Sequence, residues 1–182
     1  LREDLRSSLE LLDEDEISQQ RQVAYLESLL LTNSDTPYSD ELRLWLDDGL
    51  WNIGTYQPQL SVLRDLEASG QTQIIENQQI RRSLATVMQR IDRLETSQRD
   101  FLVSQQTVID PYLVDSFDLS DLLLEQRVDE ETDLSVLGTE GFRSRVAFKV
   151  SLRGEVTTRQ NEVREVFNET FALIDNELDA IR

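Results

Sequence analysis

Two residue types that carry much of enzyme chemistry are missing from this sequence. Its 182 residues include no cysteine and no histidine. Without cysteine there is no disulfide, no thiolate nucleophile and no sulfur-ligated zinc. Without histidine there is no Ser-His-Asp triad and no imidazole base. Lysine occurs once, so a lysine nucleophile or Schiff base would have to be Lys149.

Glycine and proline are also scarce, with six and three residues. So few turn-forming residues favour long helices over a turn-rich β fold. The usual glycine-rich nucleotide-binding motifs are absent. No run of about 18 apolar residues is present, so we expect no membrane-spanning helix within these residues.

Positive charge is in short supply as well. The chain has 36 acidic and 18 basic residues, which gives a net charge of -18. A nucleic-acid-binding face needs clustered Arg and Lys in excess, so the composition argues against a nucleic-acid partner. Leu, Ile, Val and Phe together number 57, enough to predict a folded domain.

Apolar residues spaced alternately by three and four predict three principal helices. The first runs from the start of the chain to about residue 32, the next covers residues 77–110, and the last begins near residue 140 and continues to the end. Two short helices are expected between the first two, near residues 39–52 and 58–69. The expected fold class is therefore all-α, a long-helix bundle of three principal helices with a short inserted helical pair.

Single residues mark the expected helix ends. Ser39 or Asp40 can cap one short helix, and Asn77 can cap the long helix that follows. Gly70 suits the position just after a helix. The helix beginning near Asn77 should end near residue 110, because Pro111 restricts the residue before it.

The domain organisation is simple in this interpretation. We expect one helical domain over residues 1–182, with an acidic connecting segment at residues 113–140 that carries nine acids and a single Arg. Residues 146–152 alternate apolar and polar side chains, which also fits a strand. We predict a helix there because no second strand is available to pair with it. Gly154 would then be a weak or kinked point.

One block of the chain resembles a known family. Residues 55–58 read Thr-Tyr-Gln-Pro, residues 63–70 read Leu-Arg-Asp-Leu-Glu-Ala-Ser-Gly, and residues 74–81 read Ile-Ile-Glu-Asn-Gln-Gln-Ile-Arg. Together they resemble the core of a family of uncharacterised bacterial single-pass membrane proteins. Residues 1–5 look like that family's first helix just past its membrane segment.

The resemblance implies a location but no activity. Family members have one N-terminal transmembrane helix and an acidic helical domain outside the cytoplasm, and no functional residue can be carried over. Leu1 already lies within a helical pattern, so we expect a helical segment to precede it. The resemblance implies that this segment is the membrane anchor. The implied location is inner-membrane anchored, with the domain in the periplasm.

Four polar residues occupy positions that the helix spacing predicts to be buried. They are Glu16 and Gln19 in the first helix and Gln98 and Gln105 in the helix over residues 77–110. One interpretation is a hydrogen-bonded layer that fixes helix register. The other is a polar ligand pocket inside the bundle, as in helical sensor domains.

Two further groups allow a structural and a functional interpretation. Trp45, Trp51 and Tyr56 predict core packing or a protein interface. Asp115, Asp118 and Asp121 are three apart and could face a hard cation, but they lack the calcium-loop pattern, so we expect a solvated acidic face and no metal site.

Residues 142–164 hold six basic and two acidic side chains. We expect them to dock against the acidic segment at residues 113–140 or against the first helix; the alternative is attraction to anionic lipid headgroups or an acidic partner.

The sequence therefore predicts a non-enzymatic extracytoplasmic module that acts in protein interaction or as a scaffold. We expect no catalytic residue and no cofactor, and a protein partner or self-association. The alternative is a ligand-sensing helical bundle that binds a small polar molecule.

Overall fold

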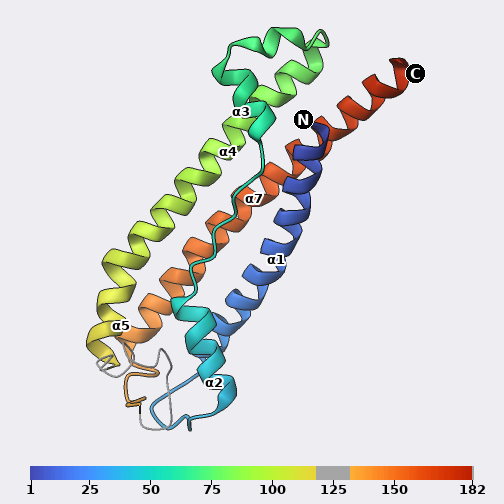
Figure 1. Cartoon of the computed structure of the whole chain (residues 1–182). Coiled ribbons are helices and arrows are strands. Elements are labelled where there is room, and N and C mark those ends of the chain that lie inside the picture. The colour runs from blue at the N-terminus through green and yellow to red at the C-terminus, as the bar shows by residue number, and fades with distance from the viewer. Residues whose placement is uncertain (118–131, 182) are drawn as a thin grey trace. The chain divides into compact units, whose positions relative to one another are not determined.

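The computed structural model describes residues 1–117 and 132–181. Within these ranges the chain contains helices and no strand, which confirms the predicted all-α class (Figure 1). The elements are, in chain order, α1 (Arg2–Leu30), α2 (Asp40–Leu44), the π-helix η1 (Trp45–Trp51), α3 (Ser61–Ala68), the 3₁₀-helix η2 (Gln71–Ile74), α4 (Gln78–Ser104), the π-helix η3 (Gln105–Ile109), α5 (Asp110–Ser116) and α7 (Glu140–Ile181). None of the helices in the described ranges is both long and apolar enough for a membrane crossing.

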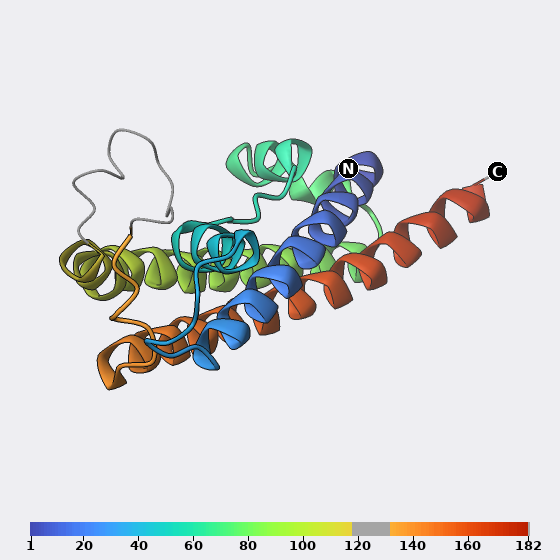
Figure 2. The same ribbon diagram turned by 90° about the horizontal axis from the view of Figure 1, so that it is seen from below.

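Residues 146–152 are helical, as expected. They lie inside α7, which has 42 residues and appears in Figure 2 as one uninterrupted orange-to-red ribbon. Gly154 neither ends this helix nor meets another atom within 4 Å of an added Cβ. The helix hydrogen bonds therefore satisfy the backbone that a lone strand would have left unpaired.

The predicted capping residues have their expected roles. The Ser39 hydroxyl accepts a hydrogen bond from Leu42 N at 3.1 Å, and Asn77 Oδ1 accepts one from Gln79 N at 2.9 Å. Gly70 follows α3 with a φ of 68°. These contacts are local, so sequence patterns could find them.

The predicted helix end near residue 110 was wrong. The π-helix η3 and then α5 continue the helical path to Ser116, with Pro111 in the first turn of α5. Proline lacks an N–H and clashes with the carbonyl four residues earlier, which disfavours a regular α-helix at this point. The wider π-helical turn immediately before Pro111 accommodates it.

The start of the second short helix was also predicted wrongly. Helix α3 begins at Ser61 rather than near Pro58, and residues 52–60 are neither helix nor strand. Proline favours an extended conformation at the residue before it. We call residues 52–60 the extended segment; it is the thin trace between η1 and α3 in Figure 1.

The described chain forms two compact units, each considered by itself. Unit 1 comprises Leu1–Glu16, Thr55–Gln98 and Val156–Arg182, and unit 2 comprises Ile17–Gly54 and Arg99–Glu155. Helices α1, α4 and α7 each contribute residues to both units. The single-domain organisation expected from the sequence stays a prediction.

Unit 1 has a mainly aliphatic core drawn from α1, α3, α4 and α7. The core residues with at most 3% of their surface exposed include Leu5, Leu12, Leu63, Leu84, Val87, Ile91, Leu94, Val156, Val163 and Phe167. Polar contacts join α4 to α7 beside this core. The Ser83 and Thr170 hydroxyls lie 2.6 Å apart, and Arg90 Nη1 lies 2.6 Å from Glu162 Oε2.

Unit 2 has a core in which aromatic rings pack against leucines. The ring of Phe117 makes edge-on contacts with Trp51 at 6.0 Å and with Phe142 at 6.2 Å between centroids. The buried members are Leu26, Leu29, Leu42, Leu46, Leu50, Ile109, Leu113, Phe117, Leu137, Phe142 and Val146. Helix α5 thus supplies the core residue Leu113, which lies beyond the helix end predicted near residue 110.

Two glycines with positive φ give a matched test of backbone constraint. Gly138 has a φ of 77°, and an added Cβ would lie 2.7 Å from Asn33 Cα, whereas Gly70 has a φ of 68° and open space. We expect Gly70→Ala to lower the free energy of unfolding by about 1–2 kcal/mol through backbone strain alone. Gly138→Ala adds a backbone clash and should cost at least twice as much. Urea denaturation measures both, and equal losses would contradict this account.

Candidate functional site

The extended segment has backbone groups that no helix or sheet satisfies, so they need other partners. In unit 1 these partners are side chains of α1 and α4. In unit 2 they are side chains of α7, and Gln105 of η3 donates to Leu50 at the end of η1. Each unit therefore has its own set of buried polar side chains, and we treat the two sets separately as candidate sites.

In unit 2, two cations one helical turn apart on α7 hold the start of the segment. Lys149 and Arg153 are 0% and 1% exposed. The Lys149 ammonium donates to the carbonyl of Leu50, in the last turn of η1. The Arg153 guanidinium donates to Gly54 O at 3.0 Å and to Asn52 O at 3.1 Å.

The end of a helix explains why cations are favoured there. The last carbonyls of a helix have no intrahelical donor and carry a partial negative charge. The side chain of Gln105, at the start of η3, adds a second donor to Leu50 O at 3.1 Å. The Phe101 ring also faces both cations, with Arg153 Cζ at 4.2 Å and Lys149 Nζ at 5.7 Å from its centroid. Such cation–π contacts stabilise buried cations.

Burial lowers the pKa of Lys149 from its ordinary value of 10.5 to about 7, and the charge of Arg153 acts in the same direction. The carboxylate of Asp110 acts against this shift. In the described part of the chain, no carboxylate oxygen lies within 4.0 Å of Lys149 Nζ, so Lys149 forms no ion pair there. The ammonium is therefore stabilised by a carbonyl and a ring.

The lowered pKa makes folding depend on pH. Between the folded value of about 7 and the unfolded value of 10.5, the unfolded chain binds more protons at Lys149. The contribution of Lys149 to the free energy of unfolding should therefore rise with pH across this window. Since Lys149 is the chain's one lysine, labelling with ¹³Cε-lysine gives a single NMR signal. We expect its titration midpoint near 7 in the folded protein, and a midpoint near 10.5 would contradict the burial argument.

In unit 1, the remainder of the extended segment is held by α1 and α4. The Ser8 hydroxyl accepts a hydrogen bond from Gln59 N at 3.0 Å and donates to Gln59 O at 3.2 Å. The Tyr56 hydroxyl donates to Ser8 O at 2.9 Å, and Gln98 Nε2 donates to Tyr56 O at 3.2 Å. Burial raises the pKa of Tyr56 well above its ordinary value, so its hydroxyl remains a donor.

The four predicted pocket residues fall into different environments. Gln98 and Gln105 are buried and donate to backbone carbonyls at residues 56 and 50. Glu16 is half-buried and pairs with Arg164 at 2.7 Å, and Gln19 is buried. Glu16 and Gln98 belong to unit 1, and Gln19 and Gln105 to unit 2. A ligand pocket at these residues stays a prediction.

The aromatic candidates lie against the cores. Trp45 and Trp51 are half-buried beside the unit 2 core, and Tyr56 is 3% exposed. Their role in an interface stays a prediction.

The acidic candidates show no metal cluster within the described ranges, where no three Asp or Glu residues could hold an ion. Asp115 is exposed. Asp118 and Asp121 lie outside the described residues, as does the middle of the acidic segment at residues 113–140.

The basic residues of α7 mostly bind other parts of the chain. Arg164 contacts Asp13 at 2.9 Å as well as Glu16. The Arg145 guanidinium lies 3.9 Å from the centroid of the Tyr112 ring. Arg164 thus docks on the first helix as the sequence predicts. Arg145, Lys149 and Arg153 instead contact an aromatic ring and backbone carbonyls.

Sequence reasoning missed Lys149, Arg153 and Ser8 as buried groups, although a signal for the first two was present. Stepping back from Val163 by alternate spacings of three and four reaches residues 160, 156, 153, 149, 146 and 142, all of which are buried. That spacing predicts that both cations face inward. Because Lys and Arg are seldom fully buried, this spacing is a weaker signal for them than for apolar residues.

The chain matches no protein-family model, no curated protein and no solved structure. Its resemblance to a family of bacterial single-pass membrane proteins therefore stays a prediction.

Proposed function

We propose that this chain is a non-enzymatic helical module that binds a protein partner through its outer helix faces. The proposal rests on the hydrogen bonds made by four polar side chains, those of Gln98, Gln105, Lys149 and Arg153. All four are buried and donate to the chain's own backbone carbonyls. Buried polar groups with such partners specify structure, which leaves the exterior as the surface for recognition.

The negative charge of the chain favours binding to partners with positively charged surfaces. A net charge of -18 keeps such a module soluble and directs it toward partners with positive surfaces. The resemblance adds a proposed location, anchored at the inner membrane with the domain in the periplasm. In that setting the module would act as a scaffold or as a docking domain for another envelope protein.

Site-specific photocrosslinking in the native cells tests the proposal. A photoreactive residue would replace one exposed aliphatic side chain at a time, at Ile17, Val62, Ile74 or Val103, which are 69%, 41%, 68% and 51% exposed. We expect a defined protein adduct at some of these positions and not at others. Adducts at none of them would contradict an interaction module.

One observation favours the ligand-sensing alternative. The amide oxygens of Gln22 and Gln105 are buried and have no hydrogen-bond partner among the described residues. A polar ligand could supply donors to them. A thermal-shift screen decides between the two: a ligand at 100 times its Kd stabilises by about 2.7 kcal/mol. A shift that is lost in Gln105→Leu would favour the sensor, and no shift with any compound favours the interaction module.

A further inference from the structure

The turn formed by α3 and η2 in unit 1 leaves two of its five large aliphatic side chains exposed and two more half-buried. We call residues 61–75 the α3–η2 hairpin. Of its large aliphatic residues Val62, Leu63, Leu66, Ile74 and Ile75, only Leu63 is fully buried. Ile74 is 68% exposed and Val62 41%. Clustered exposed apolar side chains mark interaction sites more often than single ones do.

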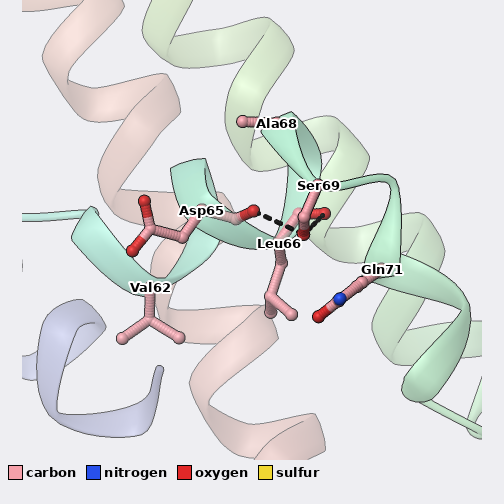
Figure 3. Close-up of a pocket in the computed structure, with 6 residues that line it drawn as sticks. All are labelled: Val62, Asp65, Leu66, Ala68, Ser69 and Gln71. Atoms are coloured by element: carbon pink, nitrogen blue, oxygen red, sulfur yellow. Dashed lines mark hydrogen bonds between the residues drawn. The ribbon is translucent and has the colours of Figure 1, made fainter.

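Two of these side chains, Val62 and Leu66, line a groove, and Ile74 lies outside that lining on η2 of the same hairpin. The groove has a volume of about 610 Å³ and is lined by Val62, Asp65, Leu66, Ala68, Ser69 and Gln71. Figure 3 shows the side chains of Val62 and Leu66 projecting from α3 to the same side, with Gln71 beside them. The groove therefore offers adjacent aliphatic contacts with polar groups at its margin.

Polar contacts fix the shape of the hairpin without covering its aliphatic side chains. The Asp4 carboxylate accepts a hydrogen bond from Val62 N at 2.9 Å at the start of α3. Arg64 pairs with Glu95 on α4 at 3.0 Å. Arg81 donates to Ile75 O at 2.6 Å. A surface fixed in advance loses little conformational entropy when a partner binds.

The charge at the hairpin indicates what kind of partner fits. Asp65 lies in the groove, Glu67 is on the same hairpin, and Glu76 follows the hairpin directly in the chain. None of the three has an ion-pair partner within residues 1–117 and 132–181. The one basic residue of the hairpin, Arg64, is already paired with Glu95. The charge available to a partner at this surface is therefore negative.

We propose that the α3–η2 hairpin docks a short segment of a protein partner that combines aliphatic side chains with Arg or Lys. The aliphatic side chains would cover Val62, Leu66 and Ile74, and the basic ones would face Asp65 and Glu67. This inference rests on the proposed function and assigns it a surface and a partner chemistry.

A model peptide tests the docking site directly. The probe is a fluorescently labelled 14-residue amphipathic helix of Leu and Lys, titrated with the whole chain and followed by fluorescence anisotropy at 150 mM salt. We expect the double variant Val62→Ser/Ile74→Ser to weaken binding at least about tenfold, which corresponds to about 1.4 kcal/mol. A Leu and Glu peptide of the same length should not bind.

A matched variant separates docking from general attraction to an acidic chain. Leu31→Ser/Val103→Ser removes two aliphatic side chains that are 84% and 51% exposed elsewhere and leaves the net charge unchanged. Its affinity should equal that of the parent. Equal weakening in both double variants, or no binding of the Leu and Lys peptide to the parent, would overturn the proposal.

A second pair tests the charge. Asp65→Asn/Glu67→Gln should weaken binding several-fold, and more so than Glu14→Gln/Asp92→Asn, which removes two exposed acids elsewhere. Equal effects of the two pairs would overturn the charge argument. In the crosslinking experiment, adducts at Ile17 or Val103 without adducts at Val62 or Ile74 would overturn this docking site and leave the proposed function in place.

Discussion

Replacement of Phe101 by alanine is expected to lower the free energy of unfolding by about 3–5 kcal/mol, the range for a fully buried aromatic side chain. The Phe101 ring is 1% exposed. Its loss would leave a cavity and would also remove the ring that faces Arg153 and Lys149. The two cations would then lie beside a void instead of a ring that attracts positive charge.

Two further variants separate these causes in urea denaturation. In Phe101→Leu the leucine fills most of the volume but has no ring. The decrease in the free energy of unfolding of this variant therefore measures the aromatic contribution, and it should be smaller than that of Phe101→Ala. Phe148→Ala makes the same change on α7 at a ring that is 40% exposed, and should cost about 1 kcal/mol or less. Similar losses at Phe101 and Phe148 would contradict the described burial.

Arg153→Met should lower the free energy of unfolding by about 2–4 kcal/mol. Methionine keeps an apolar stem but leaves the carbonyls of Asn52 and Gly54 without their donor. Each unsatisfied buried group costs about 1–3 kcal/mol. Part of this loss is offset, because the variant no longer buries a guanidinium charge beside Lys149.

The pKa of Lys149 provides a second measurement on the same variant. Because the charge of Arg153 lowers that pKa, the single lysine NMR signal should titrate at higher pH in Arg153→Met. The control is Arg159→Met, which removes a half-exposed ion pair with Glu162 and should cost about 0–1 kcal/mol. An unchanged Lys149 midpoint in Arg153→Met would show that the two cations do not interact.

The local features of the fold could be predicted from the sequence because their causes are local. The alternate spacing of three and four placed the long helices, and Ser39, Asn77 and Gly70 marked helix ends. The spacing of apolar residues does not by itself fix the buried side of α1. The polar residues Ser8 and Gln22 are buried there, and their apolar neighbours Leu9 and Val23 are only half-buried. Ser8 is buried because its hydroxyl satisfies both backbone groups of Gln59.

The candidate site could be predicted only in part. The helical spacing identified Gln98 and Gln105 as polar residues at buried positions, but it could not show which groups accept their hydrogen bonds. The acceptor of Gln105 is Leu50 O at the end of η1, and that of Gln98 is Tyr56 O in the extended segment, where a helix was expected from Pro58 onward. Where a segment lacks regular structure, its backbone partners are set by whichever side chains pack against it.

The sequence by itself determined the all-α class, the approximate bounds of the long helices and the scarcity of catalytic groups, because these depend on composition and on contacts within a few turns. Only the tertiary structure decided which side chains bind the end of η1 and the extended segment. Lys149 donates to the carbonyl of Leu50, 99 residues earlier in the chain, and Arg153 donates to that of Asn52, 101 residues earlier. No local pattern encodes a pairing at that distance. Two cations can be buried on α7 because folding brings the free carbonyls of a helix end and the Phe101 ring against them.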